Sequence, residues 1–246
     1  MEKEIGDCKQ ALKLITTALG SNEWDAFLIY LSKYKIQDSE IIYRRAINGL
    51  LGQAPPDIQL QALFHGINPH ALNDEYKKTA FWYLTSIEAQ KKLIEMGVNI
   101  NHQNYKGQTA AYSFIPMKMD LLDLHIQHGL NLDLRDNLGR SILSFVCDSF
   151  NNNACSFLLE KGANPNIQDS NGMTPLFIAI YNNQLTHAEA LLNYGASKDF
   201  LTTKNFLLRD EKTSLPIDSS VFDLVDLMYK NYPSEKSSKI RALIEE

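Results

Sequence analysis

The sequence lacks the features that mark several classes of protein. Its three cysteines, Cys8, Cys147 and Cys155, include no C-x-x-C pair, which excludes a disulfide scaffold and the usual zinc or redox motif. No apolar run approaches the roughly 18 residues of a membrane span. The acidic start is unlike a secretory signal peptide, and there is no Gly-rich phosphate loop. We therefore expect a cytoplasmic protein with no cofactor and no membrane insertion.

Charge is also not concentrated in any one place. The 246 residues include 24 basic and 29 acidic side chains, for a net charge of −5, and both signs are spread along the chain. Proteins that bind nucleic acids usually carry a basic patch or stripe. We therefore expect no nucleic-acid partner. The apolar and charged fractions, 44% and 22%, are those of an ordinary globular protein.

Glycines recur at a nearly constant spacing. Steps of 31, 32, 33 and 33 residues separate five of them: Gly66, Gly97, Gly129, Gly162 and Gly195. Each follows an apolar stretch that is typical of a helix, at the place where a helix end favours a residue of positive φ. Such a period predicts stacked repeats of one supersecondary unit.

A second glycine series, Gly107, Gly139 and Gly172, runs in parallel with steps of 32 and 33 residues. Asp or Asn precedes each glycine by three residues, and Thr or Ser follows it by two. This pattern predicts a tight turn followed by the N-cap of a new helix. Thr174-Pro175 is the clearest example, because Pro is favoured at the first helical position.

Residues 169–196, which run from Asp-Ser-Asn-Gly-Met-Thr-Pro-Leu to Leu-Leu-Asn-Tyr-Gly-Ala, resemble an ankyrin repeat. Residues 97–101 and 162–166 resemble the hairpin at the junction of two such repeats. The resemblance implies an all-α ankyrin-repeat solenoid of stacked helix-turn-helix units, with short β-hairpin-like loops and degenerate helical caps. Apolar residues such as Leu143, Leu158 and Leu191 would fill its shared core.

The repeat pattern divides the chain into three parts. Four clear repeats span residues 74–201, with bounds 74–103, 104–135, 136–168 and 169–201. Residues 1–73 are either degenerate ankyrin-like repeats or a separate helical cap, and residues 202–246 are a modified capping repeat with a tail helix.

The ends of the chain yield more detailed expectations. In the N-terminal part we expect a helix from Asn22 to Tyr34 capped by Asn22, and another over 39–51. In the C-terminal part we expect helices over 200–210, 219–232 and 234–246. The first clear repeat has Lys77 where the turn glycine belongs, but it keeps Thr79 as the expected helix cap.

Ankyrin repeats bind partners through a concave groove and hairpin tips, so the resemblance implies a non-catalytic protein-protein interaction module. Tyr, Trp, Met and Arg concentrate binding energy in interfaces, and here they recur at the repeat spacing. The expected partner-binding residues are Tyr76, Lys78, Trp82, Tyr105, Lys106, Gln108, Tyr112, Leu138, Arg140, Asp148, Asn171, Met173 and Tyr181. The alternative for Trp82, Tyr112 and Tyr181 is packing between helices.

Chemical sites are weakly indicated. His125 and His128 stand three residues apart on an expected helix, but a metal site needs a third ligand that the sequence does not supply. Cys147 and Cys155 fall at core positions. Cys8, with His65 or His70 as conceivable neighbours, is the remaining candidate nucleophile. We predict no catalytic, cofactor or metal residues.

Three functions compete. The first is the binding module, a monomer by itself that holds an unidentified protein. The second is a bacterial effector delivered into the cytosol of a host cell, which the Lys, Asn and Ile bias and the polar segment 234–246 favour. The third is an enzyme with a site in residues 1–70 or 200–246, which are short for a catalytic domain.

Overall fold

A computed structural model describes residues 13–15, 17–18, 20–34, 54–64, 70, 76–115, 117–149, 152–204, 206–207 and 214–245. The chain divides into two compact units. Unit 1 comprises residues 1–114 and 120–130, and unit 2 comprises residues 115–119 and 131–246.

Unit 1 is built from short helices that pack in sequence order. They are α2 (Trp24–Tyr34), α4 (Pro56–Phe64), the 3-10 helix η2 (Ala80–Trp82), α5 (Ile87–Glu95), the 3-10 helix η3 (Ala110–Ser113) and α6 (Met119–Gln127). Helix α2 packs on α4, α4 on α5, and η2 on both α5 and η3. The core side chains include Phe27, Leu63, Phe81, Leu93 and Leu122, all nearly inaccessible to water.

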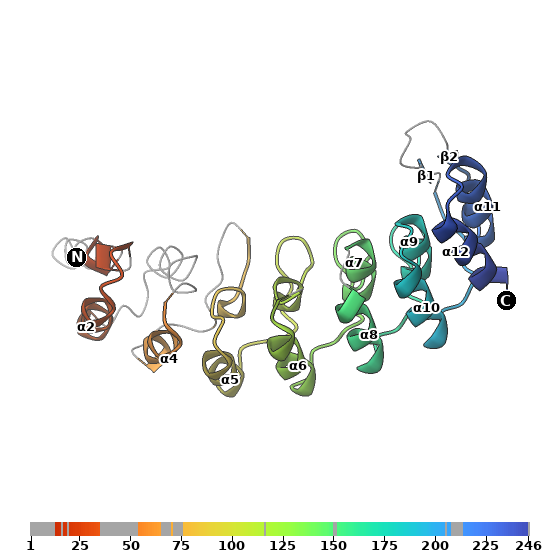
Figure 1. The fold of residues 1–246 in the computed structure, drawn as a ribbon. Helices are drawn as coiled ribbons and strands as arrows, with labels where there is room; N and C mark the ends of the chain where they lie inside the picture. Colours follow the sequence, from red (N-terminus) through yellow and green to blue (C-terminus); the bar gives the residue numbers. More distant parts are fainter. Residues whose placement is uncertain are drawn as a thin grey trace. The chain divides into compact units, whose positions relative to one another are not determined.

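Unit 2 contains helix pairs that lie side by side (Figure 1). The elements are α7 (Ile142–Asp148), α8 (Asn152–Glu160), α9 (Pro175–Tyr181), α10 (Leu185–Asn193), β1 (Phe206–Leu207), β2 (Ser214–Leu215), α11 (Val221–Asn231) and α12 (Glu235–Glu245). Each pair packs on the next, α7 on α9 and α8 on α10, then α9 on α11 and α10 on α12. Because a single pair cannot bury its own apolar face, this stacking creates the core.

The same turn precedes the first helix of three successive repeats. Its first residue is Asn104, Asp136 or Asp169, whose side-chain Oδ1 accepts hydrogen bonds from the backbone N–H groups two and four residues later, at 2.7–3.1 Å. The backbone N–H of that residue also donates to the carbonyl four residues on, at 2.9 Å. One polar side chain and the backbone hydrogen bond thus close the turn together.

Neighbouring turns are joined by backbone hydrogen bonds. In unit 1, Tyr105 N–H donates to the Tyr76 carbonyl at 3.0 Å. In unit 2, Ser170 N–H donates to the Leu138 carbonyl at 2.9 Å, and Thr203 N–H donates to the Asn171 carbonyl at 2.8 Å. The tips of adjacent turns are therefore held at fixed spacing within each unit.

The loop between the two helices of a repeat is tied to the preceding repeat by buried amides. Gln184 Nε2 donates to the carbonyls of Cys147 and Ser149, at 3.2 and 3.0 Å. In unit 1, Gln59 Oε1 accepts from the N–H groups of Thr85 and Ser86, at 2.9 and 3.1 Å. These side chains satisfy backbone groups that the short helices leave open.

The fold class expected from the sequence is confirmed. Stacked helix-turn-helix pairs form most of the described structure, and the β1–β2 pairing, with Phe206 opposite Leu215, is the antiparallel ladder of unit 2. Helices α11 and α12 match the helices expected over 219–232 and 234–246. The division into four central repeats with atypical ends stays a prediction.

Several detailed expectations are wrong. Thr79 and Thr109 precede only 3-10 turns, and their side chains make no capping hydrogen bond, unlike Ser141 and Thr174. The helix expected over 200–210 is not formed: residues 201–204 are irregular and Phe206–Leu207 is a strand.

Asn22 is not an N-cap, because its φ of 58° is left-handed and an N-cap is extended. Instead, Glu23 N–H donates to the carbonyl of Ala18, five residues back, just as Gln184 N–H donates to that of Ala179 after left-handed Asn183. Asn22 is therefore part of an interhelical loop of the same geometry as the loop at 182–184. The helix expected over 39–51 lies outside the described residues.

Two glycines of similar positive φ allow the turn packing to be tested. A Cβ at Gly172 (φ 81°) would lie 2.6 Å from the Thr203 nitrogen and 2.8 Å from the Leu201 oxygen, whereas one at Gly162 (φ 88°) would meet open space. We predict that Gly162→Ala costs about 1–2 kcal/mol, the cost of positive φ alone. Gly172→Ala costs about 1–3 kcal/mol more, because backbone must move.

Urea unfolding of the whole chain, followed by circular dichroism, measures both costs. Equal destabilisation by the two substitutions would contradict the packing of residues 201–203 against the turn of 169–173.

Candidate protein-binding surfaces

Unit 2 has a hollow of about 380 Å³ where two turns meet the first helix of a repeat. The six residues of unit 2 that were expected to bind a partner all line it: Leu138, Arg140, Asp148, Asn171, Met173 and Tyr181. The hydrogen bond between Ser170 and Leu138 brings the two tips together at its rim. We call this feature the unit 2 hollow.

The unit 2 hollow combines apolar walls with a fixed charge. The Leu138 side chain is 57% exposed, while those of Met173 and Tyr181 are half-buried. Arg140 is held in place because its guanidinium donates to Asp136 Oδ2 at 3.1 and 3.3 Å, and lies 3.5 Å from Asp148 Oδ2. Such a site can accept an apolar side chain beside a polar group.

The sequence did not indicate three other residues of this lining: Asp169, Ile178 and Lys204. Asp169 was interpreted only as a turn residue. Burial raises its pKa, although two backbone N–H groups and the charges of Arg140 and Arg135 act in the opposite direction. Lys204 lies beyond the last regular repeat, where the glycine spacing offers no guide.

Unit 1 presents aromatic rings covered by ammonium groups. The Tyr76 and Tyr105 rings lie 5.4 Å apart at 59°, and Tyr105 is 44% exposed. Lys78 Nζ is 4.7 Å from the centre of the Trp82 ring and 5.5 Å from that of Tyr76, within cation–π range. Lys106 Nζ lies 5.6 Å from the Tyr105 ring. We call these five residues the tyrosine–lysine cluster.

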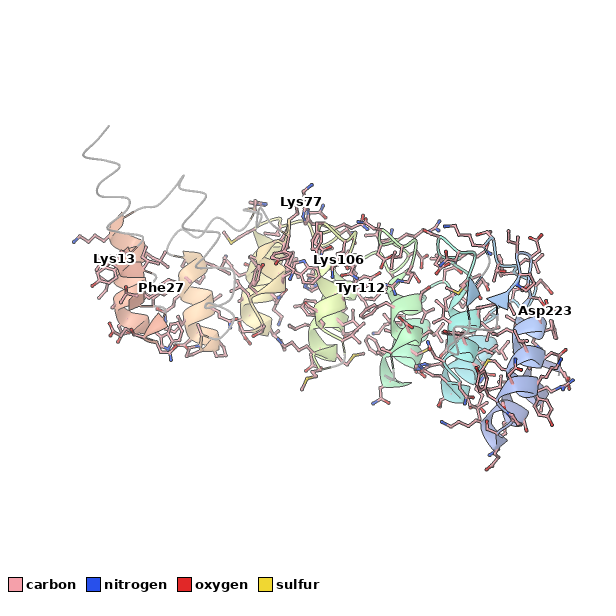
Figure 2. The ribbon with its side chains drawn as sticks, turned by 90° about the horizontal axis from the view of Figure 1, so that it is seen from above. Lys13, Phe27, Lys77, Lys106, Tyr112 and Asp223 are labelled. Carbon is pink, nitrogen blue, oxygen red and sulfur yellow. The ribbon has the colours of Figure 1, made fainter. Side chains whose placement is uncertain are left out.

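The lysines of this cluster affect each other electrostatically. Burial lowers the pKa of Lys78, and the positive charge of Lys106 lowers it further. Exposed Lys77 adjoins them with a left-handed φ of 51°, so it adopts the conformation of the glycine it replaces. Figure 2 labels Lys77 and Lys106.

Gln108 and Tyr112, the other expected residues of unit 1, offer less surface. Gln108 closes its turn through backbone hydrogen bonds and is half-buried. The Tyr112 ring is only 7% exposed, as its alternative of packing between helices requires. Trp82 is half-buried beneath Lys78. We therefore leave Tyr112 out of the proposals below.

His125 is a core residue of unit 1. Its ring is inaccessible to water and meets the Phe81 and Phe114 rings edge to face, at 4.7 and 4.8 Å. Gln90 Nε2 donates to the Phe81 and Leu84 carbonyls. The Gln90 Oε1 therefore accepts from His125 Nε2–H, at 2.8 Å. His128 bonds instead to the Leu124 carbonyl, so the two rings have separate partners.

A proton on the second ring nitrogen of His125 would be unfavourable. Among the described residues, Nδ1 is buried without a hydrogen-bond partner. Burial, and to a lesser degree His128, lowers the pKa of His125 to about 4, from 6.5. The unfolded chain therefore binds a proton at this residue between these pH values and the folded chain does not.

We predict that His125 contributes its whole share to the free energy of unfolding above pH 6.5. That contribution falls by on the order of 3 kcal/mol as the pH drops toward 4. Urea titrations across that range measure the slope. His125→Gln keeps a donor for Gln90 but cannot titrate, so it should remove this part of the slope. The variant His128→Gln, at an exposed site, should keep most of it, because burial is the larger cause of the lowered pKa of His125. An unchanged slope in His125→Gln would show that His125 is not the residue responsible for the loss of stability at low pH.

Cys147 and Cys155 are both buried, and burial raises the pKa of the Cys147 thiol well above its usual range. Neither is accessible to a substrate. Cys8 and His65 lie outside the described residues. Among the helices described, none has the length and apolar character to cross a bilayer.

The paired short helices, the repeated polar turns and the stacked core define a helical repeat protein. The sequence of residues 117–201 matches the family described as "Ankyrin repeats (3 copies)". Residues 117–201 of the chain are ankyrin repeats.

Relatives named for their ankyrin repeats share parts of this sequence. Two Acanthamoeba polyphaga mimivirus proteins are 40% and 28% identical over 75 and 101 residues, covering 30% and 41% of this chain. A Rickettsia felis protein is 33% identical over 134 residues, or 52% of this chain. The matches span only 18%, 14% and 43% of those proteins, respectively. Ankyrin repeats are generally protein-protein interaction modules.

Proposed function

We propose that the chain is a non-catalytic module that holds another protein by its turn tips and first helices. The partner's anchor is an apolar side chain that enters the unit 2 hollow between Leu138, Met173 and Tyr181. Backbone hydrogen bonds hold the tips in place before binding, so little conformational entropy of the tips is lost on association. The module is a monomer by itself and acts in the cytoplasm or in a host cytosol.

One observation carries this proposal: six residues that were each expected to bind a partner from their positions in the repeats all line the same hollow. Side chains that served only to pack the repeats would be buried. Leu138 is instead 57% exposed at its edge. Partly exposed apolar residues around a fixed Arg140 are what an interface centre requires.

Leu138→Ala/Met173→Ala should weaken partner capture. Loss of two anchor side chains is expected to cost about 2 kcal/mol or more of binding free energy. Affinity purification from the native cell, with quantitative mass spectrometry, compares the partner recovered by the wild type and by this variant.

Met117→Ala is the matched control, because Met117 is 90% exposed and absent from the lining of the hollow. It should recover as much partner as the wild type. Equal recovery by the double variant, with circular dichroism unchanged, would count against the unit 2 hollow.

A narrower proposal is a bacterial effector that acts on a host protein by binding it. Matches to proteins of Rickettsia felis and Rickettsia bellii support it. Its delivery signal would lie in residues 234–246. Helix α12 buries Ile240 and Ile244, and Lys198 Nζ donates to the Ile244 carbonyl. A truncation would therefore remove part of the core together with any signal.

Transplanting the segment avoids that difficulty. We predict that a reporter ending in residues 234–246 enters the host cytosol from an intracellular bacterium, and that the same reporter with the segment scrambled does not. Equal delivery of both, or of neither, would remove this proposal. An enzyme is not favoured, because the ankyrin family is generally non-catalytic and Cys147 and Cys155 are buried.

A further inference from the structure

Within the part of the chain that the structure describes, no carboxylate pairs with the lysines of the tyrosine–lysine cluster or with the adjoining Lys77. By contrast, Arg140 in unit 2 contacts two carboxylates. The chain as a whole is acidic, at −5, whereas the described residues of the cluster carry an excess of positive charge.

The arrangement of the cluster keeps these charges close together. Lys78 Nζ lies over the Trp82, Tyr76 and Tyr83 rings, which restrict its position. The hydrogen bond from Tyr105 N–H to the Tyr76 carbonyl holds the two turns, and with them Lys78 and Lys106, side by side. Two ammonium groups held near each other repel, and an anion between them relieves that repulsion.

We infer that the tyrosine–lysine cluster binds an acidic segment of a partner protein. Carboxylates of the segment pair with Lys78 and Lys106, and an apolar or aromatic side chain packs on the partly exposed Tyr76 and Tyr105. This inference rests on the proposed protein-binding function and names the chemistry of a second contact.

A nucleic acid fits the cluster less well. Stacking of bases requires open aromatic faces, yet Lys78 lies over Trp82 and Lys106 lies over Tyr105. The Tyr76 and Tyr105 rings are tilted by 59° and form no parallel slot for a base. An extended acidic peptide needs only the ammonium groups and the ring edges.

The test selects binders to the whole chain from a random peptide library. We expect the selected peptides to be rich in Asp and Glu, and their Kd to rise with salt. Lys78→Met/Lys106→Met keeps the apolar stems and removes both charges. It should weaken the selected peptides by about tenfold, as the loss of two partly exposed ion pairs implies.

Lys91→Met is the matched control, since Lys91 is an exposed lysine of unit 1 on α5, outside the cluster. It should leave the Kd of each peptide unchanged. Selected peptides that lack acids, equal affinity for the Lys78→Met/Lys106→Met variant, or no selected peptide at all would overturn the inference. Tighter binding of single-stranded oligo-dT than of any selected peptide would do so too.

The same peptides separate this inference from the proposed function. Leu138→Ala/Met173→Ala should not alter their affinity, because those residues belong to the other unit. If that variant loses the native partner while acidic peptides never bind, only the acidic-segment inference fails. If acidic peptides bind but the Leu138→Ala/Met173→Ala variant still recovers the native partner, the proposed role of the unit 2 hollow is wrong instead.

Discussion

The structure depends on one polar side chain at the start of each turn. Asn104, Asp136 and Asp169 each accept hydrogen bonds from two backbone N–H groups through a single oxygen, and these bonds add to the backbone hydrogen bonds that close the turn. The closed turn places its tip against the tip of the neighbouring turn and directs the next residues into the first helix. Stacking of apolar helix faces supplies most of the stability, but the turns determine where the exposed side chains lie.

That constraint connects the fold to binding. Residues at the tips contribute little to the core, so their side chains are free to differ from repeat to repeat while the backbone beneath them stays fixed. In unit 2 the tips carry Leu138 and Met173, which form an apolar hollow beside Arg140. In unit 1 the tips carry Tyr76 and Tyr105 with their lysines. One backbone design thus supports two surfaces of different chemistry.

The regular part of this fold could be predicted from the sequence because its signals are local. The glycine spacing and the polar residue three positions before each turn glycine indicated the repeats, and Thr174-Pro175 indicated a capped helix. Prediction failed where tertiary packing decides. Thr79 and Thr109 look like Thr174 in sequence but begin 3-10 turns. The strand at Phe206–Leu207 depends on its pairing with residues 214–215, and no short sequence pattern predicts that pairing. Burial of Tyr112 and the partners of His125 likewise depend on neighbouring repeats.

Amide hydrogen exchange tests the role of the turn side chain most directly. In the wild type, the N–H groups of Asn171, Met173 and Thr203 should be protected. Asp169→Asn should preserve their protection, because Asn104 performs the same task in another repeat. Asp169→Ala should expose all three together, since loss of the turn also loosens the tip that Thr203 contacts. Continued protection of Thr203 in Asp169→Ala would contradict the account, because the tips would then hold their places without the turn side chain.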